Sequence, residues 1–236
     1  MKLTRPRDIK APPEASPDNY PVFLDLKGKQ CVVIGGGKVA ERKVLSLLRA
    51  GARLKVISPE LTDSLNAGRL RKAFLHVARE FRKGDLKGAF LVIAATSNDL
   101  INRKISEEAP FLVSIADAPE RGNFVSPAFL QKGPLAIAVS TGGASPAMAS
   151  AIKKELDALY PKEFISYLLF LENLRRDVKK KIPAQEARER FFREAASVKI
   201  LGIIRKEGIL SAEKIVLESF GKYQKQPCSK KHTKSQ

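Results

Sequence analysis

A chain of 236 residues, 44% of them hydrophobic, is long enough to bury the core of one large domain and a smaller one. Its formal net charge of +18 favours an anionic partner, such as nucleic acid, acidic lipid headgroups or a small polyanion. No apolar stretch approaches the roughly 20 residues of a membrane span, and no apolar run follows the charges of the N-terminal segment. We therefore expect neither a transmembrane helix nor a secretory signal.

The N-terminal half of the chain alternates predicted strands and helices. Residues 1–19 are rich in proline and are predicted to be a disordered leader. The predicted strands are Gln30–Ile34, Arg53–Ile57, one within 74–81, 90–95 and 111–116. The predicted helices between them are 38–48, one that begins at Ser58 and Pro59, and one from Ser97 or Asn98 to Glu108. This alternation predicts an α/β fold with a doubly wound parallel sheet.

A glycine loop joins the first predicted strand to the first predicted helix. The segment GGGKVA at 35–40 fits the pattern G-x-G-x-x-A. In this pattern Gly35 permits a tight turn, Gly37 lets the backbone approach a pyrophosphate, and Ala40 lets the helix pack closely on the strand. The helix N-terminus then faces the negative charge. The loop in this context predicts a Rossmann-like, dinucleotide-binding unit, and a turn that binds nothing is the alternative.

The second predicted strand ends without the acidic residue that often holds the ribose of NAD. Ser58, Pro59 and Glu60 stand there instead, so the ribose contact is assigned to Glu60, to Ser58 or to backbone around Pro59. No arginine stands at the end of this strand to bind a 2′-phosphate, which favours NAD over NADP. Lys38 has two interpretations, a phosphate contact or a solvent-exposed side chain. The predicted cofactor-binding residues are Gly35, Gly37, Lys38, Val39, Pro59, Glu60 and Thr96.

Beyond residue 134 the pattern changes to one strand and a series of charged helices. Leu135–Val139 predicts a strand, and Ser145 and Pro146 start a helix that runs to about Tyr160. The segment 164–220 is predicted to be helical, with breaks at Ile182-Pro183 and near Gly208. The predicted parts after the leader are a Rossmann-like domain at 20–134, a segment at 135–163, a small helical domain at 164–221 and a basic disordered tail at 222–236.

The two cysteines and two histidines argue against a metal site. Cys31 lies in an apolar run and is expected to be a buried, inert strand residue, whereas Cys228 lies in the polar tail. Neither cysteine, nor His76 or His232, has a partner at metal-ligand spacing. We therefore expect no metal site, and a reducing, cytoplasmic compartment.

Seven segments carry a resemblance when they are taken together and in order. They are YPVFLDLKGKQ at 20–30, VIGGGKVAERK at 33–43, GARLKVISPEL at 51–61, AATSND at 94–99, IADAPE at 115–120, NFVSPA at 123–128 and VSTGGASP at 139–146. In these segments the chain resembles the precorrin-2 dehydrogenase and sirohydrochlorin ferrochelatase family, which includes the N-terminal half of bacterial siroheme synthases. The resemblance covers residues 20–161 closely and the helical remainder loosely.

The resemblance implies an activity, a partner and an assembly. The implied activity is the NAD-dependent oxidation of precorrin-2 to sirohydrochlorin, in the biosynthesis of sirohaem and related tetrapyrroles. Some members of the family also insert ferrous iron, which leaves a bifunctional enzyme as an alternative. Members are homodimers in which the segment corresponding to 135–163 forms much of the contact. The substrate carries eight carboxylates, so it is the kind of polyanion that the basic chain favours.

The resemblance also implies site residues. Asp117 corresponds to the family's catalytic aspartate and would accept or relay the proton lost with the hydride; a role in capping the turn at Ala118 is the alternative. Ser114 stands where many relatives have Asn, and is assigned to the substrate side. Thr141, Gly142, Gly143 and Ser145 precede a helix and are expected to receive a substrate carboxylate, whereas an ordinary cap by Ser145 is the alternative.

Two functions of other classes remain open at this point. A Rossmann-like unit can bind NAD as a regulatory module without catalysis. Nucleic-acid binding through the basic helices and tail is the third hypothesis, but the helical segment has no interleaved aromatic residues and no zinc or RNA-binding motif. We therefore expect no specific nucleic-acid partner.

Overall fold

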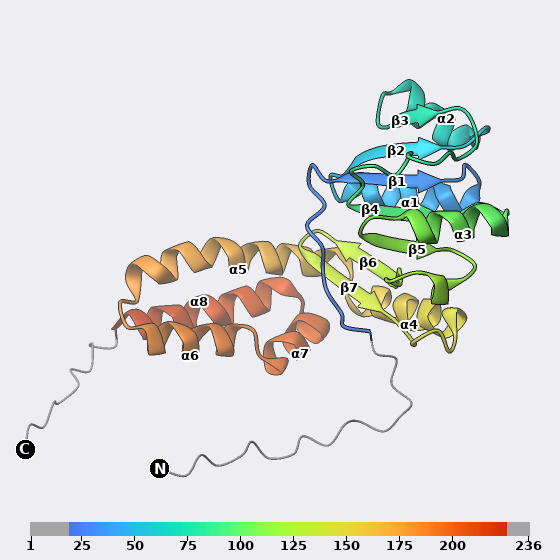
Figure 1. Ribbon diagram of the computed structural model, residues 1–236. Helices are drawn as coiled ribbons and strands as arrows, with labels where there is room; N and C mark the ends of the chain where they lie inside the picture. The colour runs from blue at the N-terminus through green and yellow to red at the C-terminus, as the bar shows by residue number, and fades with distance from the viewer. Residues whose placement is uncertain (1–18, 226–236) are drawn as a thin grey trace, which may run out of the picture. The chain divides into compact units, whose positions relative to one another are not determined.

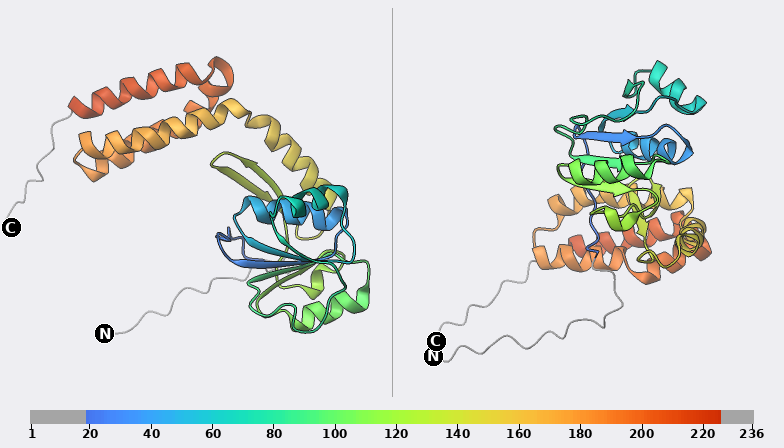
Figure 2. Two further views of the ribbon diagram at one scale, coloured as in Figure 1. Left: turned by 90° about the horizontal axis from the view of Figure 1, so that it is seen from above. Right: turned by 45° about the vertical axis from the view of Figure 1, so that its right-hand side comes forward.

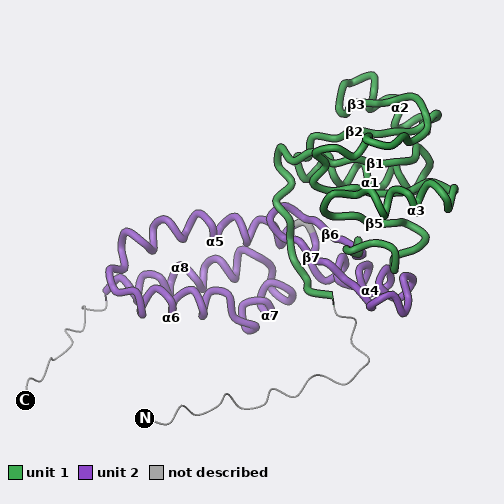
Figure 3. The backbone as a smooth tube through the Cα atoms, viewed as in Figure 1, with its two compact units in different colours: residues 1–126 green, residues 127–236 purple. Residues whose placement is uncertain are grey.

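The computed structural model describes residues 19–225, with the side chain of Lys162 left out (Figure 1). The predicted leader, apart from Asn19, and the tail from residue 226 lie outside the described residues. The chain divides into two compact units, residues 1–126 and 127–236 (Figure 3). No helix of the described part is long and apolar enough to cross a membrane.

Unit 1 is built around a five-stranded parallel sheet with the strand order β3-β2-β1-β4-β5. Its strands are β1 (Gln30–Ile34), β2 (Arg53–Ile57), β3 (Leu75–Val77), β4 (Leu91–Ala94) and β5 (Leu112–Ile115). Its helices are α1 (Lys38–Arg49), α2 (Asp63–Leu70), α3 (Asp99–Glu108) and the 3-10 turn η1 (Pro119–Arg121). Figure 2 shows α1 and α3 on opposite faces of the sheet. The predicted doubly wound parallel sheet is therefore confirmed.

Apolar residues on both faces of the central strands explain why the sheet takes a helix on each side. On one face Ala40, Val44 and Leu47 of α1 pack against alternate residues of β1, β2 and β4. On the other face Ile105 of α3 packs against the intervening residues of β1, β4 and β5. A strand that is buried on both faces is typical of a parallel sheet. The two cores together hold the strands in register, so that their carboxyl ends lie at the same edge of the sheet.

The helix after β2 does not begin where the sequence predicts it. Ser58 and Pro59 fit the start of a helix locally, but α2 begins at Asp63, and Thr62 caps it by accepting a hydrogen bond from the backbone N of Leu65. The reason is tertiary. The backbone N of Ser58 donates to the Val77 carbonyl and extends the contact of β2 with β3. Because this bond keeps Ser58 in line with the sheet, the turn into the helix is delayed.

Cys31 lies in β1 and is completely buried, as predicted. Burial raises the pKa of its thiol to about 11. Because the thiolate is the reactive form, we expect Cys31 of a Cys228→Ser variant to react with a thiol reagent about 100-fold more slowly in the folded protein than in urea. The absorbance of the released thiol anion, followed over time at pH 8, measures both rates. Equal rates would contradict a buried, protonated Cys31.

The described part of unit 2, residues 127–225, contains a two-stranded antiparallel sheet and five helices. Its elements are β6 (Ala128–Lys132), β7 (Leu135–Val139), α4 (Pro146–Leu159), α5 (Lys162–Lys181), α6 (Gln185–Ala195), α7 (Val198–Glu207) and α8 (Ile209–Lys225). Strand β6 was not predicted from the sequence, and the predicted boundary at residue 134 falls in the turn between β6 and β7. The helix breaks at Ile182 and Gly208 are confirmed, but a further break at Ala196-Ser197 was not predicted. Helix α8 continues to Lys225.

The helical part of unit 2 has its own core, centred on Phe191. Residues from α5, α6, α7 and α8 contribute to it, including Tyr167, Val178 and Val216. The hydroxyl of Tyr167 donates to the Ala195 carbonyl at 2.6 Å and so provides a hydrogen-bond partner for one of the carbonyls at the end of α6. Burial raises the pKa of Tyr167 to about 12. This hydrogen bond ties α5 to the unpredicted break between α6 and α7.

Lys132 of β6 holds the C-terminal end of α4. Its Nζ atom donates to the carbonyls of Asp157 and Tyr160 at 2.7 and 2.8 Å, and it pairs with the Asp157 carboxylate at 2.8 Å. A cation at this end of a helix satisfies carbonyls that lack partners within the helix. We expect Lys132→Met to lower the free energy of unfolding by about 1–3 kcal/mol, since it leaves two carbonyls without this donor.

Urea denaturation measures this loss, and Asp157→Asn provides the matched comparison. It removes only the half-exposed ion pair and is expected to cost at most about 1 kcal/mol. If the two variants lost the same stability, the carbonyl contacts of Lys132 would not be the stabilising part of this interaction.

Candidate functional site

The candidate residues of unit 1 meet at one edge of the sheet because the strand ends are in register. Ile34 of β1 is level with Ile57 of β2 and with Ala94 of β4, and Ala94 is level with Ile115 of β5. The glycine loop, Pro59-Glu60, Thr96 and Asp117 each follow one of these four ends directly or within a few residues. Ligands of open α/β sheets bind at this carboxyl edge. The structure therefore brings these predicted residues to one edge of the sheet.

The three glycines of the loop have different surroundings. Gly35 has φ +114°, and a Cβ atom there would overlap the carbonyl of Ala95. A Cβ atom at Gly36 would overlap the carbonyl oxygen of Glu60 and lie 2.8 Å from Oγ of Ser58. At Gly37 no atom lies within 4 Å of that position. Gly35 and Gly36 are thus required by close backbone packing, while Gly37 has open space for a ligand. The role of Gly36 was missed, because the motif treats this position as variable.

Helix α1 begins without a side-chain cap, unlike α2 and α3. Gly37 is its N-cap residue and offers no side chain, whereas Thr62 caps α2 and Asn98 caps α3. The first amides of α1, those of Lys38 and Val39, therefore have no capping partner within the described part of the protein. Free amides at a helix N-terminus bind phosphate. A pyrophosphate fits this exposed position, with Gly37 leaving room for its approach.

Lys38 and Glu41 form an ion pair on the first turn of α1. The Lys38 side chain is 84% exposed, and its Nζ lies 3.4 Å from Oε2 of Glu41. Of the two interpretations of Lys38, the structure thus shows the solvent-exposed side chain. Oε2 of Glu41 also accepts a hydrogen bond from Oγ1 of Thr62 at 2.6 Å. This hydrogen bond and, after it, the charge of Lys38 hold the pKa of Glu41 below its usual value. Glu41 was not singled out from the sequence, since no motif marks it.

The end of β4 is fixed by Thr96 and Asn102. Oγ1 of Thr96 donates to the amide oxygen of Asn102 at 2.7 Å, and the amide nitrogen of Asn102 donates to the Thr96 carbonyl at 3.0 Å. Asn102 lies on α3 and is buried. This pair of hydrogen bonds ties the turn after β4, which lies beside Gly35, to α3.

Asp117 is exposed in the bend after β5. The backbone N of Ala116 donates to the Ala94 carbonyl at 2.9 Å, so the strand pairing continues up to the residue before Asp117. The alternative role of Asp117 in capping gains no support, because the turn η1 has Ala118 as its N-cap residue and no side-chain cap. The Asp117 carboxylate is left at the sheet edge, where a reacting group can approach it.

The loop after Asp117 is folded back on β5 by Asn123. Oδ1 of Asn123 accepts a hydrogen bond from the backbone N of Val113 at 2.8 Å, and its Nδ2 donates to the Phe111 carbonyl at 2.6 Å. The Asn123 side chain thereby gives hydrogen-bond partners to a backbone N–H and a carbonyl at the open side of the edge strand β5. Asn123 begins the NFVSPA segment, which carries part of the family resemblance, but its role in the fold was not predicted from the sequence. Ser114 is 9% exposed and lies within β5 opposite Ile93, below the open edge rather than on it.

The predicted anion-binding loop of unit 2 uses its own polar groups. Oγ of Ser145 caps α4 by accepting from the backbone N of Met148, and Oγ1 of Thr141 both accepts from the N and donates to the carbonyl of Ser145. The backbone N of Gly142 donates to Oγ of Ser140. Gly142 and Gly143 have φ +62° and +87°, conformations that glycine adopts readily. The loop therefore has the geometry of a capped helix, the simpler of its two interpretations.

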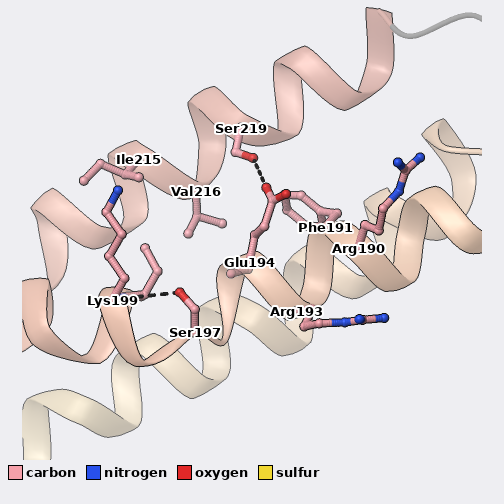
Figure 4. A pocket seen from close by; sticks show the side chains of 11 residues that line it. Arg190, Phe191, Arg193, Glu194, Ser197, Lys199, Ile215, Val216 and Ser219 are labelled. Carbon is pink, nitrogen blue, oxygen red and sulfur yellow. Dashed lines mark hydrogen bonds between the residues drawn. The ribbon is translucent and has the colours of Figure 1, made fainter.

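A cavity of about 530 Å³ lies in unit 2, among α6, α7 and α8, and contains none of the candidate residues. Figure 4 shows Glu194 in its middle, with Lys199 and Arg190 toward its two ends. The Glu194 carboxylate accepts hydrogen bonds from Ser219 and Tyr223. Its acidic group is thus already engaged, and the cavity offers no convergent set of catalytic groups.

Metal-binding chemistry finds little support in the described part of the chain. No group of three or more His, Cys, Asp or Glu residues there is placed to hold a metal ion. His76 lies on β3, and its Nε2 is 2.9 Å from the Ser58 carbonyl oxygen. Since β3 and β5 are the two outer strands of the sheet, His76 and Asp117 belong to opposite sides of unit 1.

The fold and the glycine cradle define an α/β protein that binds a dinucleotide. Residues 22–128 match a family described as putative NAD(P)-binding, and residues 132–159 match the central part of sirohaem biosynthesis proteins. The predicted dinucleotide cofactor is thereby confirmed. The structure of SirC, a precorrin-2 dehydrogenase, matches with a TM-score of 0.72 and 25% sequence identity, over 87% of this chain and 100% of that chain.

Two siroheme synthases are similar in sequence. The protein of Thioalkalivibrio sulfidiphilus is 39% identical over 178 residues, which are 74% of this chain and 36% of that protein. The protein of Nitrosomonas europaea is 37% identical over 181 residues, 75% of this chain and 38% of that protein. The chain thus spans less than two fifths of the length of these relatives. The chain is therefore similar to a precorrin-2 dehydrogenase and to the matching part of the siroheme synthases, which is the resemblance that its sequence motifs predicted.

Proposed function

We propose that this chain is an oxidoreductase that uses NAD to oxidise precorrin-2 to sirohydrochlorin, within sirohaem and tetrapyrrole biosynthesis. The observation that carries the proposal is the sheet edge of unit 1, where a dinucleotide cradle and an exposed carboxylate follow strands that are in register. The similarity to SirC over the whole length of that protein supports the choice of substrate. The similarity to siroheme synthases supports the pathway.

Each part of the edge has a separate task. The free amides of α1 bind the pyrophosphate, with Gly35, Gly37, Lys38 and Val39 around it. Pro59 and Glu60 adjoin the adenosine ribose, and Thr96 flanks the cofactor. Bound NAD supplies the hydride acceptor. These assignments form the cofactor site of the proposal.

Asp117 completes the chemistry, because dehydrogenation removes a proton as well as a hydride. Its carboxylate oxygen accepts the proton from the macrocycle and passes it to solvent, which reaches this exposed bend. Positioned general bases of this kind contribute roughly 10²–10⁴-fold to rates. The excess of basic residues attracts the polycarboxylated substrate.

The contacts to the substrate and the assembly are further parts of the proposal. We assign Ser114, Thr141, Gly142, Gly143 and Ser145 to the substrate side, although the hydrogen bonds within the 141–145 loop leave it few free donors. We assign residues 135–163 to a homodimer contact and the protein to the cytoplasm, where the buried Cys31 stays a free thiol.

Insertion of ferrous iron is a weaker candidate. It needs groups that remove the pyrrole protons and guide the metal, and among the described residues Asp117 has no histidine beside it, since His76 lies on the other outer strand. Oxidation is therefore the function that the geometry supports best.

An anaerobic assay with freshly generated precorrin-2 and NAD tests the proposal. We expect NADH and the sirohydrochlorin spectrum to appear together and in equal amounts. Binding of NAD without turnover would reject the dehydrogenase and favour a NAD-sensing regulatory module. Failure to bind NAD would reject both functions.

A further inference from the structure

Three side chains connect the first turn of α1 with the loop after β2. Oγ1 of Thr62, in that loop, donates to Oε2 of Glu41, and the same oxygen pairs with Nζ of Lys38. The Glu41 side chain is 15% exposed, whereas that of Lys38 is 84% exposed. One carboxylate oxygen therefore joins the Thr62 hydroxyl on one side to an exposed ammonium group on the other.

This connection lies beside the part of the fold that receives the adenosine ribose. In Rossmann-like units the ribose hydroxyls lie against the end of the second strand. Here the loop after β2 packs directly on the glycine loop, because the Glu60 carbonyl touches Gly36 and the backbone N of Thr62 donates to the Gly36 carbonyl at 3.0 Å. Glu41 is bonded to that same loop through Thr62.

The residue that usually reads the ribose is missing from its ordinary position. Ser58 follows β2 and is buried, with Oγ facing Gly36, its N bonded to Val77 and its carbonyl next to His76. It thus supplies no charge to a ligand. Glu60 and Asp63 are exposed in this loop and at the start of α2, and no ion pair fixes either carboxylate among the described residues.

The position of Lys38 is electrostatically unfavourable. It is the first residue of α1, where the positive end of the helix dipole repels a cation. The Glu41 carboxylate offsets this repulsion, and the Thr62 hydrogen bond keeps that carboxylate in place. A lysine held at this end of a helix by a single carboxylate becomes available to an anionic ligand as soon as the carboxylate is removed.

We propose that Glu41 is the residue that selects NAD over NADP in this protein, by holding Lys38 and by placing a fixed negative charge beside the ribose 2′ position. The proposal rests on the dinucleotide site of the proposed function. A 2′-phosphate would meet the Glu41 carboxylate and would have to compete with it for the Lys38 ammonium group. Glu41 lies on α1, and in this protein it performs the selection that an acid at the end of β2 performs in related folds.

Calorimetric titration of the full chain with NAD and with NADP tests this selection, because the two ligands differ only in the 2′-phosphate. The quantity to compare is the ratio of the two dissociation constants. We expect Glu41→Gln to improve NADP binding relative to NAD by about tenfold, since it removes a like charge and frees Lys38. The double variant Glu41→Gln with Lys38→Met is expected to lose most of that gain.

Two controls separate selection from other effects. Glu107→Gln removes an exposed carboxylate of α3 and should leave the ratio unchanged. A loosened loop in Glu41→Gln would weaken both ligands together and leave the ratio unchanged, which would overturn the proposal. A larger effect of Glu60→Gln than of Glu41→Gln on the ratio would also overturn it. If the unaltered chain bound neither ligand, the dinucleotide site itself would be rejected, which is a distinct outcome.

Discussion

Replacing Asp117 by asparagine is expected to slow the oxidation of precorrin-2 by roughly 10²–10⁴-fold, the range attributed to a positioned general base. The side chain keeps its size and its place in the bend after β5, but it can no longer accept a proton. Because Asp117 is exposed and does not cap the turn η1, little stability depends on it. We therefore expect the midpoint of urea unfolding and the affinity for NAD to change little, while turnover is almost lost.

The comparison that isolates this effect uses Glu120→Gln. Glu120 is another exposed carboxylate of the same loop, three residues further along, within η1. Steady-state rates of the two variants, measured anaerobically with saturating NAD, should differ by at least about 100-fold. Similar rates for both would show that the loop's charge, rather than the Asp117 carboxylate, promotes the reaction. A large fall in NAD affinity in Asp117→Asn would place Asp117 in cofactor binding instead.

Much of unit 1 could be predicted because its signals are local. The bounds of β1 follow from a short apolar run that stops at the glycine loop, and those of β2 from a segment of alternating polar and apolar residues that stops at a serine-proline pair. The glycine loop and Asp117 lie next to such runs, so finding the strands also placed the site at their carboxyl ends. In unit 2, β7 was found for the same reason, since Leu135–Val139 is wholly apolar.

The missed features depend on contacts that are distant in the chain. Strand β6 has a single buried residue, Leu130, and exists because β7 pairs with it. Ser58 satisfies the local rule for a helix start, but its bond with Val77 overrides that rule. Glu41 acquires its role only when Thr62 is folded against α1, 21 residues further along. No single-sequence pattern encodes such pairings, because each depends on the register of the sheet.

Two neighbouring substitutions in the glycine loop are expected to differ in their effect on stability. In Gly36→Ala the added methyl group would overlap the Glu60 carbonyl and crowd Oγ of Ser58, so the loop after β2 must move away from the glycine loop. Overpacking against backbone is costly, and we expect a loss of about 2–4 kcal/mol in the free energy of unfolding. NAD affinity should fall with it, since the displaced loop carries Pro59 and Glu60, the proposed ribose contacts.

In Gly37→Ala the methyl group meets no protein atom within 4 Å, so the fold has room for it. We expect at most about 1 kcal/mol of lost stability, the usual cost of alanine at an N-cap position. The same methyl group stands on the proposed approach of the pyrophosphate to the amides of α1, so NAD affinity should fall by at least about tenfold.

Urea unfolding and calorimetric NAD titration on both variants separate the two effects. Stability lost at Gly36 but kept at Gly37, with NAD binding weakened in both, is the expected pattern. If Gly37→Ala bound NAD as tightly as the unaltered chain, the pyrophosphate would not lie against the N-terminus of α1. Since Gly36 packs against the protein itself while Gly37 faces open space, the pair distinguishes the glycine that builds the cradle from the glycine that admits the ligand.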